Sequence, residues 1–257
     1  MSNITLLIIL GVASYFFGNI NWALLISKLK KGDIRKMGSG NPGTLNMSRN
    51  FGLKIGLLTF FLDVSKGVIP TLVAYLVLVG RGYVDGTEFQ LFELGIYLCG
   101  FLAVMGHIYP VVLKFKGGKG IATTIGVLIV IESVHGISWA SVLIMSLVCA
   151  VVFIYFTEFG AMGSFIAITP PAIAGGIRLY IYYGTKQGLE SILYLICCML
   201  IFLICFFTWF AHRKNIDRML KGEEHPTSIK QMVIKNKAKK QQQQLEQTNK
   251  EESSNKK

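Results

Sequence analysis

Long apolar segments alternate with short polar ones over most of this chain. Three segments, residues 4–28, 53–80 and 89–113, are predominantly apolar. The hydrocarbon core of a bilayer is about 30 Å thick, and a helix needs roughly 20 apolar residues to cross it. Each of these segments is long enough, so each predicts a transmembrane helix.

A fourth apolar stretch, residues 121–209, is much longer than one crossing. Polar or glycine-containing breaks at residues 132–136, 157–163 and 182–188 divide it into four pieces. The first piece, 121–133, is short for a full span and is expected to be tilted or shielded by its neighbours. The pattern therefore predicts an all-α, polytopic membrane protein with about seven transmembrane helices, six or five being the alternatives.

Composition supports a single membrane domain rather than an ordinary soluble one. Hydrophobic residues make up 52% of the chain and charged residues 16%, which is too apolar for a typical globular domain. The cysteines lie in apolar runs without metal-type spacing and are interpreted as core or lipid-facing residues. They are Cys99, Cys149, Cys197, Cys198 and Cys205. We predict no metal site and no cofactor.

Basic residues are distributed unevenly between the predicted spans. They are frequent between the first two spans, after the third span and at the C-terminus, whereas the opposite loops hold only Arg81, Arg178 and Lys186. Because basic residues near span ends resist translocation, seven spans place the N-terminus outside and the C-terminus in the cytoplasm. Residues 1–224 are expected to form the membrane domain. Residues 225–257, basic and glutamine-rich, are predicted to be a disordered cytoplasmic tail.

The segment KMGSGNPGTLNMSRNFG, residues 36–52, carries the first candidate chemistry. Its glycines argue against regular helix and allow backbone N–H groups to point at an anion. The planar guanidinium of an arginine suits phosphate. The alternative is a flexible inside loop whose charges only set topology. The candidate phosphate-binding residues are Gly38, Ser39, Gly40, Asn41, Asn46 and Arg49.

The segment GHIYPVVLKFKGGKG, residues 106–120, forms a basic, glycine-rich turn before an apolar helix. A phosphate there would meet ammonium groups and a helix N-terminus, although the spacing is not that of a nucleotide P-loop. The histidine at the end of the span is either a structural group or a functional one. The candidate residues are His107, Lys114, Gly117, Gly118 and Lys119.

The segment AHRKNIDRMLKGEE, residues 211–224, follows the last span. If the helix continues, His212 and Asn215 share a face at i, i+3, and Arg213 can pair with Asp217 at i, i+4. The alternative is a basic stop signal. Within the second span, Asp63 and Lys66 form an i, i+3 pair that marks either a buried structural pair or the wall of a polar pocket.

Together these segments resemble the bacterial acyl-phosphate:glycerol-3-phosphate acyltransferase family, the PlsY type. The resemblance rests on GSGNPG-x-x-N-x-x-R, GH-x-x-P with KGGKG, and HR-x-N-I in this order, and it runs from about Leu6 to Glu224. It implies an integral membrane enzyme of the bacterial cell membrane with its active site on the cytoplasmic face. The chain departs from the family pattern at Leu45, Glu158 and Ala161.

The resemblance further implies transfer of a fatty acyl group from acyl phosphate to the 1-position of glycerol 3-phosphate. The products would be lysophosphatidic acid and phosphate, in the first step of phospholipid synthesis. By resemblance, Ser39, Arg49 and Lys119 hold substrate phosphate, while His212 and Asn215 complete the polar pocket. The expected catalytic group is therefore Ser39, Lys119, His212 and Asn215. Membrane lipid is an expected partner, nucleic acid is not, and a monomer is plausible.

Two questions stay open at the level of the sequence. The general base is His212, His107 or the substrate phosphate itself, because an unperturbed histidine titrates near neutrality. The rival functions are a transporter or channel for an organic anion and a structural protein that binds lipid headgroups. A transporter predicts polar or broken helices near the midplane, whereas these polar motifs gather on one predicted face.

Overall fold

The computed structural model describes residues 1–224 and 227, and this part of the chain is all-α, as predicted. Three 3-10 turns, Ile34–Lys36, Val79–Arg81 and Val111–Leu113, lie between the helices. The helices are α1 (Asn3–Gly18), α2 (Trp22–Leu29), α3 (Thr44–Phe51), α4 (Leu53–Leu78), α5 (Leu91–Ile108), α6 (Ile121–Ser133), α7 (Ile137–Thr157), α8 (Gly160–Tyr183), α9 (Leu189–Ala211) and α10 (Arg213–Leu220). The predicted tail, residues 225–257, lies outside the described residues apart from Thr227.

Six segments of the described chain are long and apolar enough to cross a membrane, where the sequence predicted about seven. The expected seventh is α6, which has only 13 residues and is about 20 Å long at 1.5 Å per residue. It packs against α4, α5, α7, α8 and α9, and most of its residues are buried. Its neighbours therefore shield a helix too short to span a bilayer alone.

Close helix packing in the bundle depends on glycine. A Cβ atom on Gly67 of α4 would lie 2.0 Å from the Thr123 carbonyl oxygen, and one on Gly126 of α6 would lie 2.1 Å from the Val64 carbonyl oxygen. Membrane helices gain association energy from such close approach because lipid offers no hydrophobic drive between them. The contact holds α6, and hence the glycine-rich turn that precedes it, firmly against α4.

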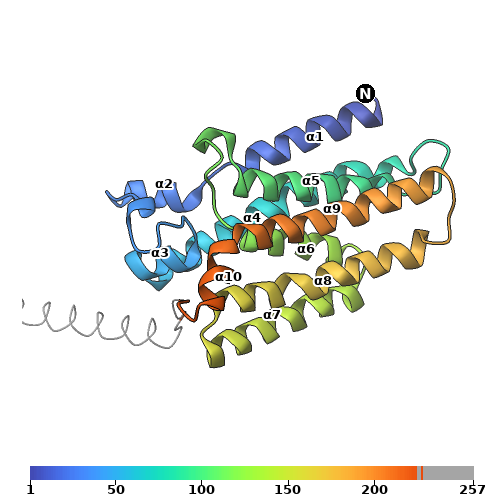
Figure 1. The fold of residues 1–257 in the computed structure, drawn as a ribbon. Coiled ribbons are helices and arrows are strands. Elements are labelled where there is room, and N and C mark those ends of the chain that lie inside the picture. Colours follow the sequence, from blue (N-terminus) through green and yellow to red (C-terminus); the bar gives the residue numbers. More distant parts are fainter. Residues whose placement is uncertain (225–226, 228–257) are drawn as a thin grey trace, which may run out of the picture.

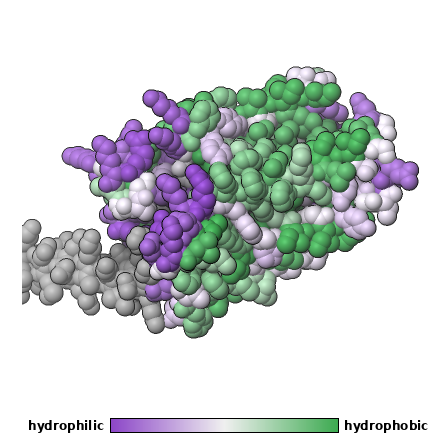
Figure 2. Space-filling view, viewed as in Figure 1, coloured by the Kyte–Doolittle hydropathy of each residue, from purple (hydrophilic) through white to green (hydrophobic). Residues whose placement is uncertain are grey.

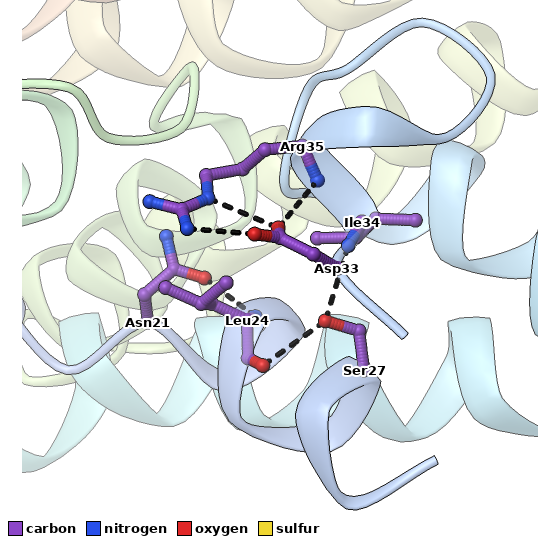
Figure 3. A network of polar contacts seen from close by, with 6 residues as sticks. All are labelled: Asn21, Leu24, Ser27, Asp33, Ile34 and Arg35. Atoms are coloured by element: carbon purple, nitrogen blue, oxygen red, sulfur yellow. Dashed lines mark hydrogen bonds and ion pairs between the residues drawn. The ribbon is translucent and has the colours of Figure 1, made fainter. Parts of the chain in front are cut away.

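The connection from α2 to α3 begins as an ordered structure (Figure 3). The Ser27 hydroxyl donates to the Leu24 carbonyl at 3.0 Å and accepts from the Ile34 backbone N–H at 3.2 Å. Asp33 accepts two side-chain hydrogen bonds from Arg35, at 3.0 and 2.7 Å. The Arg35 guanidinium holds the pKa of the Asp33 carboxyl at about 2. Arg35 is therefore engaged with its own turn rather than with the later motifs.

Polar residues gather at one end of the molecule. On the face drawn in Figure 2, hydrophobic residues cover the length of the bundle, and the largest hydrophilic area lies where α2, α3 and α10 are found (Figures 1 and 2). The N-terminus lies at the opposite end of the bundle from α10 (Figure 1). All three candidate segments therefore belong to one end, as the sequence predicted. Which side of the membrane this end faces stays a prediction.

One charged residue was assigned wrongly from the sequence. Arg178 was counted in a loop opposite the basic face, but it lies within α8 and is fully buried. Its guanidinium donates to Glu93 of α5 at 2.9 Å and to the Tyr97 hydroxyl at 2.7 Å. A paired charge is less costly in the membrane interior than an isolated one. Helix α8 therefore runs on through Arg178 to Tyr183 instead of ending in a loop before it.

Candidate functional site

The glycine-rich turn before α6 is anchored to the end of α5. The backbone N–H groups of Gly117 and Gly118 donate to the carbonyls of Ile108 and His107 at 3.2 and 3.1 Å. A Cβ atom on Gly117 would lie 2.0 Å from the His107 carbonyl oxygen, and one on Gly118 would lie 2.3 Å from the His107 Nε2 atom. A side chain at either position would clash with His107, so these two glycines hold the backbone that leads directly into Lys119.

Lys119 joins the second candidate segment to the third. Its ammonium group donates a short hydrogen bond to the Asn215 side-chain oxygen on α10. The other side of the same amide donates to the Glu224 carboxylate at 2.6 Å, and Arg218 donates to that carboxylate at 2.9 Å. These contacts give Asn215 one orientation, with its oxygen directed to Lys119. The sequence analysis did not assign roles to Arg218 and Glu224.

His212 occupies the junction between α9 and α10. Helix α9 ends at Ala211, directly before it. The His212 imidazole is buried, and its Nδ1 atom is 2.9 Å from the Thr208 carbonyl. Because a carbonyl can only accept, Nδ1 carries the proton and donates it. Burial, and then the charge of Lys119, lower the pKa of His212 to about 4. At neutral pH the ring is uncharged, and its Nε2 atom is left as an acceptor.

Charged residues from the other two candidate segments shift the pKa of Lys119. Burial lowers the pKa of Lys119 to about 8, the Glu224 carboxylate opposes this shift, and the positive charges of Arg218 and Arg49 add to it. Arg49 comes from α3, in the first candidate segment, and Arg218 from α10. We call Lys119, Arg49, Arg218, Asn215 and Glu224 the cationic cluster. It carries three positive charges and one negative charge, as expected of a pocket for a phosphate dianion.

Asn46 organises the first candidate segment. Its amide nitrogen donates to the carbonyls of Met37 and Ile34 at 2.9 and 3.3 Å, and its side-chain oxygen accepts from the Ser39 backbone N–H at 3.1 Å. Asn46 is buried, whereas Ser39 is exposed at the end of the turn. The loop of Gly38, Ser39, Gly40 and Asn41 is thus held by an internal side chain, with left-handed backbone at Gly38 and Gly40 (φ +54° and +68°).

Two basic residues of the candidate segments, Arg213 and Lys114, lie outside the cationic cluster. Arg213 is exposed, with its guanidinium 4.6 Å from the centre of the Phe210 ring and a hydrogen bond of 3.1 Å to the Phe210 carbonyl. Its expected ion pair with Asp217 was wrong, since Asp217 pairs with Lys221 at 3.0 Å. Lys114 is exposed at a left-handed position that starts the turn (φ +53°). Neither Arg213 nor Lys114 therefore has a described contact with the cationic cluster.

His107 lies beneath the turn rather than on its surface. The side chain is buried, 6% exposed, and its Nδ1 atom is 2.7 Å from the Lys66 ammonium nitrogen. Lys66 in turn forms an ion pair of 2.8 Å with Asp63. Of the two interpretations of the Asp63–Lys66 pair, the structure supports the buried pair.

A second buried polar network lies near the other end of the bundle, where the sequence analysis predicted none. It comprises Glu93, Tyr97, His135 and Arg178, with the His135 Nε2 atom 2.9 Å from Glu93. The signal that could have revealed it is the presence of single charges inside predicted spans, because such residues are buried against partners.

The fold defines a multi-pass α-helical membrane protein with a cluster of cationic side chains at one end of its bundle. The model of the glycerol-3-phosphate acyltransferase family matches residues 8–222. A glycerol-3-phosphate acyltransferase of Finegoldia magna is 39% identical over 86% of this chain and 96% of its own length, and one of Mycoplasmopsis pulmonis is 32% identical over 83% and 89%. This chain belongs to the glycerol-3-phosphate acyltransferase family.

Solved structures agree with this assignment. The chain is similar to the glycerol 3-phosphate form of PlsY, an integral membrane glycerol 3-phosphate acyltransferase, with a TM-score of 0.65 and 30% identity over 86% of this chain and 94% of that one. The lysophosphatidic acid form gives a TM-score of 0.66 and 28% identity over 89% and 98%. The resemblance found in the sequence is thereby confirmed.

Proposed function

We propose that this protein transfers a fatty acyl group from acyl phosphate to the 1-position of sn-glycerol 3-phosphate, giving lysophosphatidic acid and phosphate. The observation that carries the proposal is the hydrogen bond from Lys119 to Asn215, which joins two of the candidate segments beside the neutral His212, with the charge of Arg49 from the remaining segment acting on Lys119. The crystal structures of PlsY in glycerol 3-phosphate and lysophosphatidic acid forms support the choice of acceptor and product.

The reaction requires positioning and charge neutralisation. The C1 hydroxyl oxygen attacks the acyl carbon, a new ester C–O bond forms, and the bond from the acyl carbon to the phosphate oxygen breaks. Phosphate leaves with the electron pair of that bond. Lys119 and Arg49 hold the two phosphates near each other, and Ser39, Gly38, Gly40 and Asn41 line the approach. Preorganised cations and donors of this kind stabilise developing negative charge without metal-ion chemistry being required.

The proton of the attacking hydroxyl goes to the departing phosphate. The pKa of His212 is lowered to about 4, whereas a phosphate group accepts its second proton with a pKa of about 6 when esterified, and the departing inorganic phosphate is at least as basic. Phosphate is thus the stronger base of the two. The Nε2 atom of His212 accepts a hydrogen bond from the hydroxyl and orients it, and the buried His107 contacts the turn rather than the reacting atoms.

The sidedness and the domain boundaries belong to the same proposal. With α6 counted as a short seventh crossing, the N-terminus lies outside and α10, the cluster and the tail face the bacterial cytoplasm. Exposed lysines at the cluster end, among them Lys28, Lys30, Lys31 and Lys116, favour this orientation. Residues 1–224 form the catalytic membrane domain. A transporter is disfavoured because the cluster lies at one end and not at the midplane.

Purified protein in detergent is expected to convert palmitoyl phosphate and sn-glycerol 3-phosphate to lysophosphatidic acid. Palmitoyl-CoA in place of palmitoyl phosphate should give little product, because the cationic cluster stabilises the charge of a phosphate leaving group and not that of a thiolate. Product is measured by thin-layer chromatography with labelled glycerol 3-phosphate. Efficient use of palmitoyl-CoA would contradict the proposed donor, and a folded protein inactive with both donors would contradict the reaction.

The value of kcat/KM for glycerol 3-phosphate is expected to fall as the pH rises through about 8. Lys119 is charged below its pKa of about 8 and neutral above it, so phosphate binding is strong below this value and lost above it. Initial rates between pH 6 and pH 10 test this. In a Lys119→Arg variant that retains activity, the alkaline decline should move to higher pH. A wild-type profile that stays flat to pH 10 would rule out Lys119 as the titrating group.

A further inference from the structure

Lys66 makes contacts to three parts of the fold from inside the bundle. The side chain is fully buried, and its ammonium nitrogen lies 2.8 Å from the Asp63 carboxylate of α4, 2.8 Å from the Ile20 carbonyl and 2.7 Å from the His107 Nδ1 atom of α5. Ile20 is in the break between α1 and α2. The three ammonium donors therefore have acceptors on α4 itself, on α5 and in the break between α1 and α2.

These contacts determine the tautomer of His107. An ammonium group has three donors and no acceptor, so the His107 Nδ1 atom must accept from it. The Asp63 carboxylate is 3.8 Å from the same nitrogen, too far for a hydrogen bond. The proton of the neutral ring consequently sits on Nε2, the atom that faces the Gly118 backbone.

His107 supports the turn that carries Lys119. Its carbonyl accepts from the Gly118 N–H at 3.1 Å, and its ring fills the space where a side chain on Gly118 would lie. Gly118 is bonded directly to Lys119. A rotation of the His107 ring or a shift of the end of α5 would thus move the Lys119 ammonium group away from Asn215. The ring is kept in place by Lys66.

We propose that Lys66, together with Asp63, is a positioning residue for acyl transfer. The pair holds His107, and through it the Gly117–Lys119 turn, in the geometry that binds the phosphate of glycerol 3-phosphate. A buried ion pair in a membrane domain carries a large desolvation cost and stabilises a fold weakly, if at all. Its contacts to three segments around the turn assign it to the site. The inference rests on the proposed function.

The Glu93–Arg178 pair provides a matched control. It is equally buried and joins α5 to α8 with a hydrogen bond of 2.9 Å, but its contacts are to Tyr97 and His135 near the other end of the bundle. Two double variants replace both members of each pair by uncharged residues. They are Asp63→Asn with Lys66→Met, and Glu93→Gln with Arg178→Met.

Steady-state kinetics and thermal unfolding of both double variants test the inference. We expect the Asp63/Lys66 variant to raise KM for glycerol 3-phosphate about 10- to 100-fold, the effect of a misplacement of about 1 Å, with KM for palmitoyl phosphate changed much less. The Glu93/Arg178 variant should keep both KM values within about twofold, whatever its thermal stability. Equal KM values for glycerol 3-phosphate in wild type and a folded Asp63/Lys66 variant would overturn the inference, and so would equal kinetic losses in both variants.

The nitrogen shifts of His107, from selective ¹⁵N labelling and NMR, give a readout independent of activity. The wild type should show a protonated Nε2 and an Nδ1 that accepts a hydrogen bond, and Lys66→Met should remove the latter signature. Unchanged shifts in Lys66→Met would overturn the inference even if the double variant fails to fold. Wild-type protein without acyltransferase activity would count against the proposed function instead, and the His107 shifts would then decide the inference.

Discussion

Lys119→Met is expected to lower kcat/KM for glycerol 3-phosphate by about 10²- to 10³-fold, the loss typical of one preorganised donor to developing charge. Methionine keeps an unbranched side chain of similar length, so packing is largely retained, but the charge and the hydrogen bond to Asn215 are removed. The substrate phosphate then meets Arg49 and Arg218 without the half-buried Lys119 cation between the glycine turn and α10. Initial rates of labelled lysophosphatidate formation measure the loss.

Lys116→Met is the matched control for this prediction. Lys116 is in the same turn and carries the same charge, but it is exposed. Surface charges contribute little to specific contacts, so its kcat/KM should stay within a few-fold of wild type. A similar loss in both variants would mean that the turn supplies only a general positive potential, and the assignment of Lys119 to the pocket would be wrong.

Asn46→Asp is expected to have the second largest effect, a loss of activity of at least about 100-fold with a lower thermal unfolding temperature. The substitution hardly changes shape, but it places a carboxylate oxygen where the amide nitrogen donates to the carbonyls of Met37 and Ile34. Buried acceptors left without a donor cost about 1–3 kcal/mol each, more when a charge is involved. The loop that presents Ser39 should therefore open. Activity and differential scanning calorimetry measure the two effects.

Asn50→Ala tests whether this effect is specific to the loop core. Asn50 is exposed and donates to Asn46 at 2.9 and 3.0 Å, so its removal leaves the contacts of Asn46 to the loop intact. It should cost about 1–2 kcal/mol of stability, because two hydrogen bonds of about 0.5–1.5 kcal/mol each are lost. If Asn46→Asp were fully active, Asn46 would not organise the site.

Hydropathy and motif spacing predicted most of the fold. The six spans were predictable because the length and apolar composition of a segment decide whether it can cross a bilayer. The short α6 was recognised as exceptional because its 13 residues cannot reach across. Arg178 was misassigned because a charge in an apolar run has two solutions, a loop or a buried partner, and its partner Glu93 is 85 residues away in the chain.

The residue types of the site were predictable, but their partners were only partly so. A buried asparagine beside glycines has the same sequence signature whether it binds a ligand or its own loop, which is why Asn46 was expected to contact phosphate. The Asp217–Lys221 pair could have been chosen over Arg213–Asp217, because an acidic residue N-terminal to a basic one is the favoured order at i, i+4. Glu224 contacts Asn215 only after the chain turns back beyond α10.

The most direct test of the account is the phosphate balance of the reaction. Purified wild-type protein with palmitoyl phosphate and labelled sn-glycerol 3-phosphate should release one inorganic phosphate for each lysophosphatidate formed, with no release beyond the control level when glycerol 3-phosphate is omitted. That result is predicted if one pocket holds both phosphates and transfers the acyl group directly. Phosphate release without lysophosphatidate, or no reaction from folded protein, would contradict an acyltransferase site at the cationic cluster.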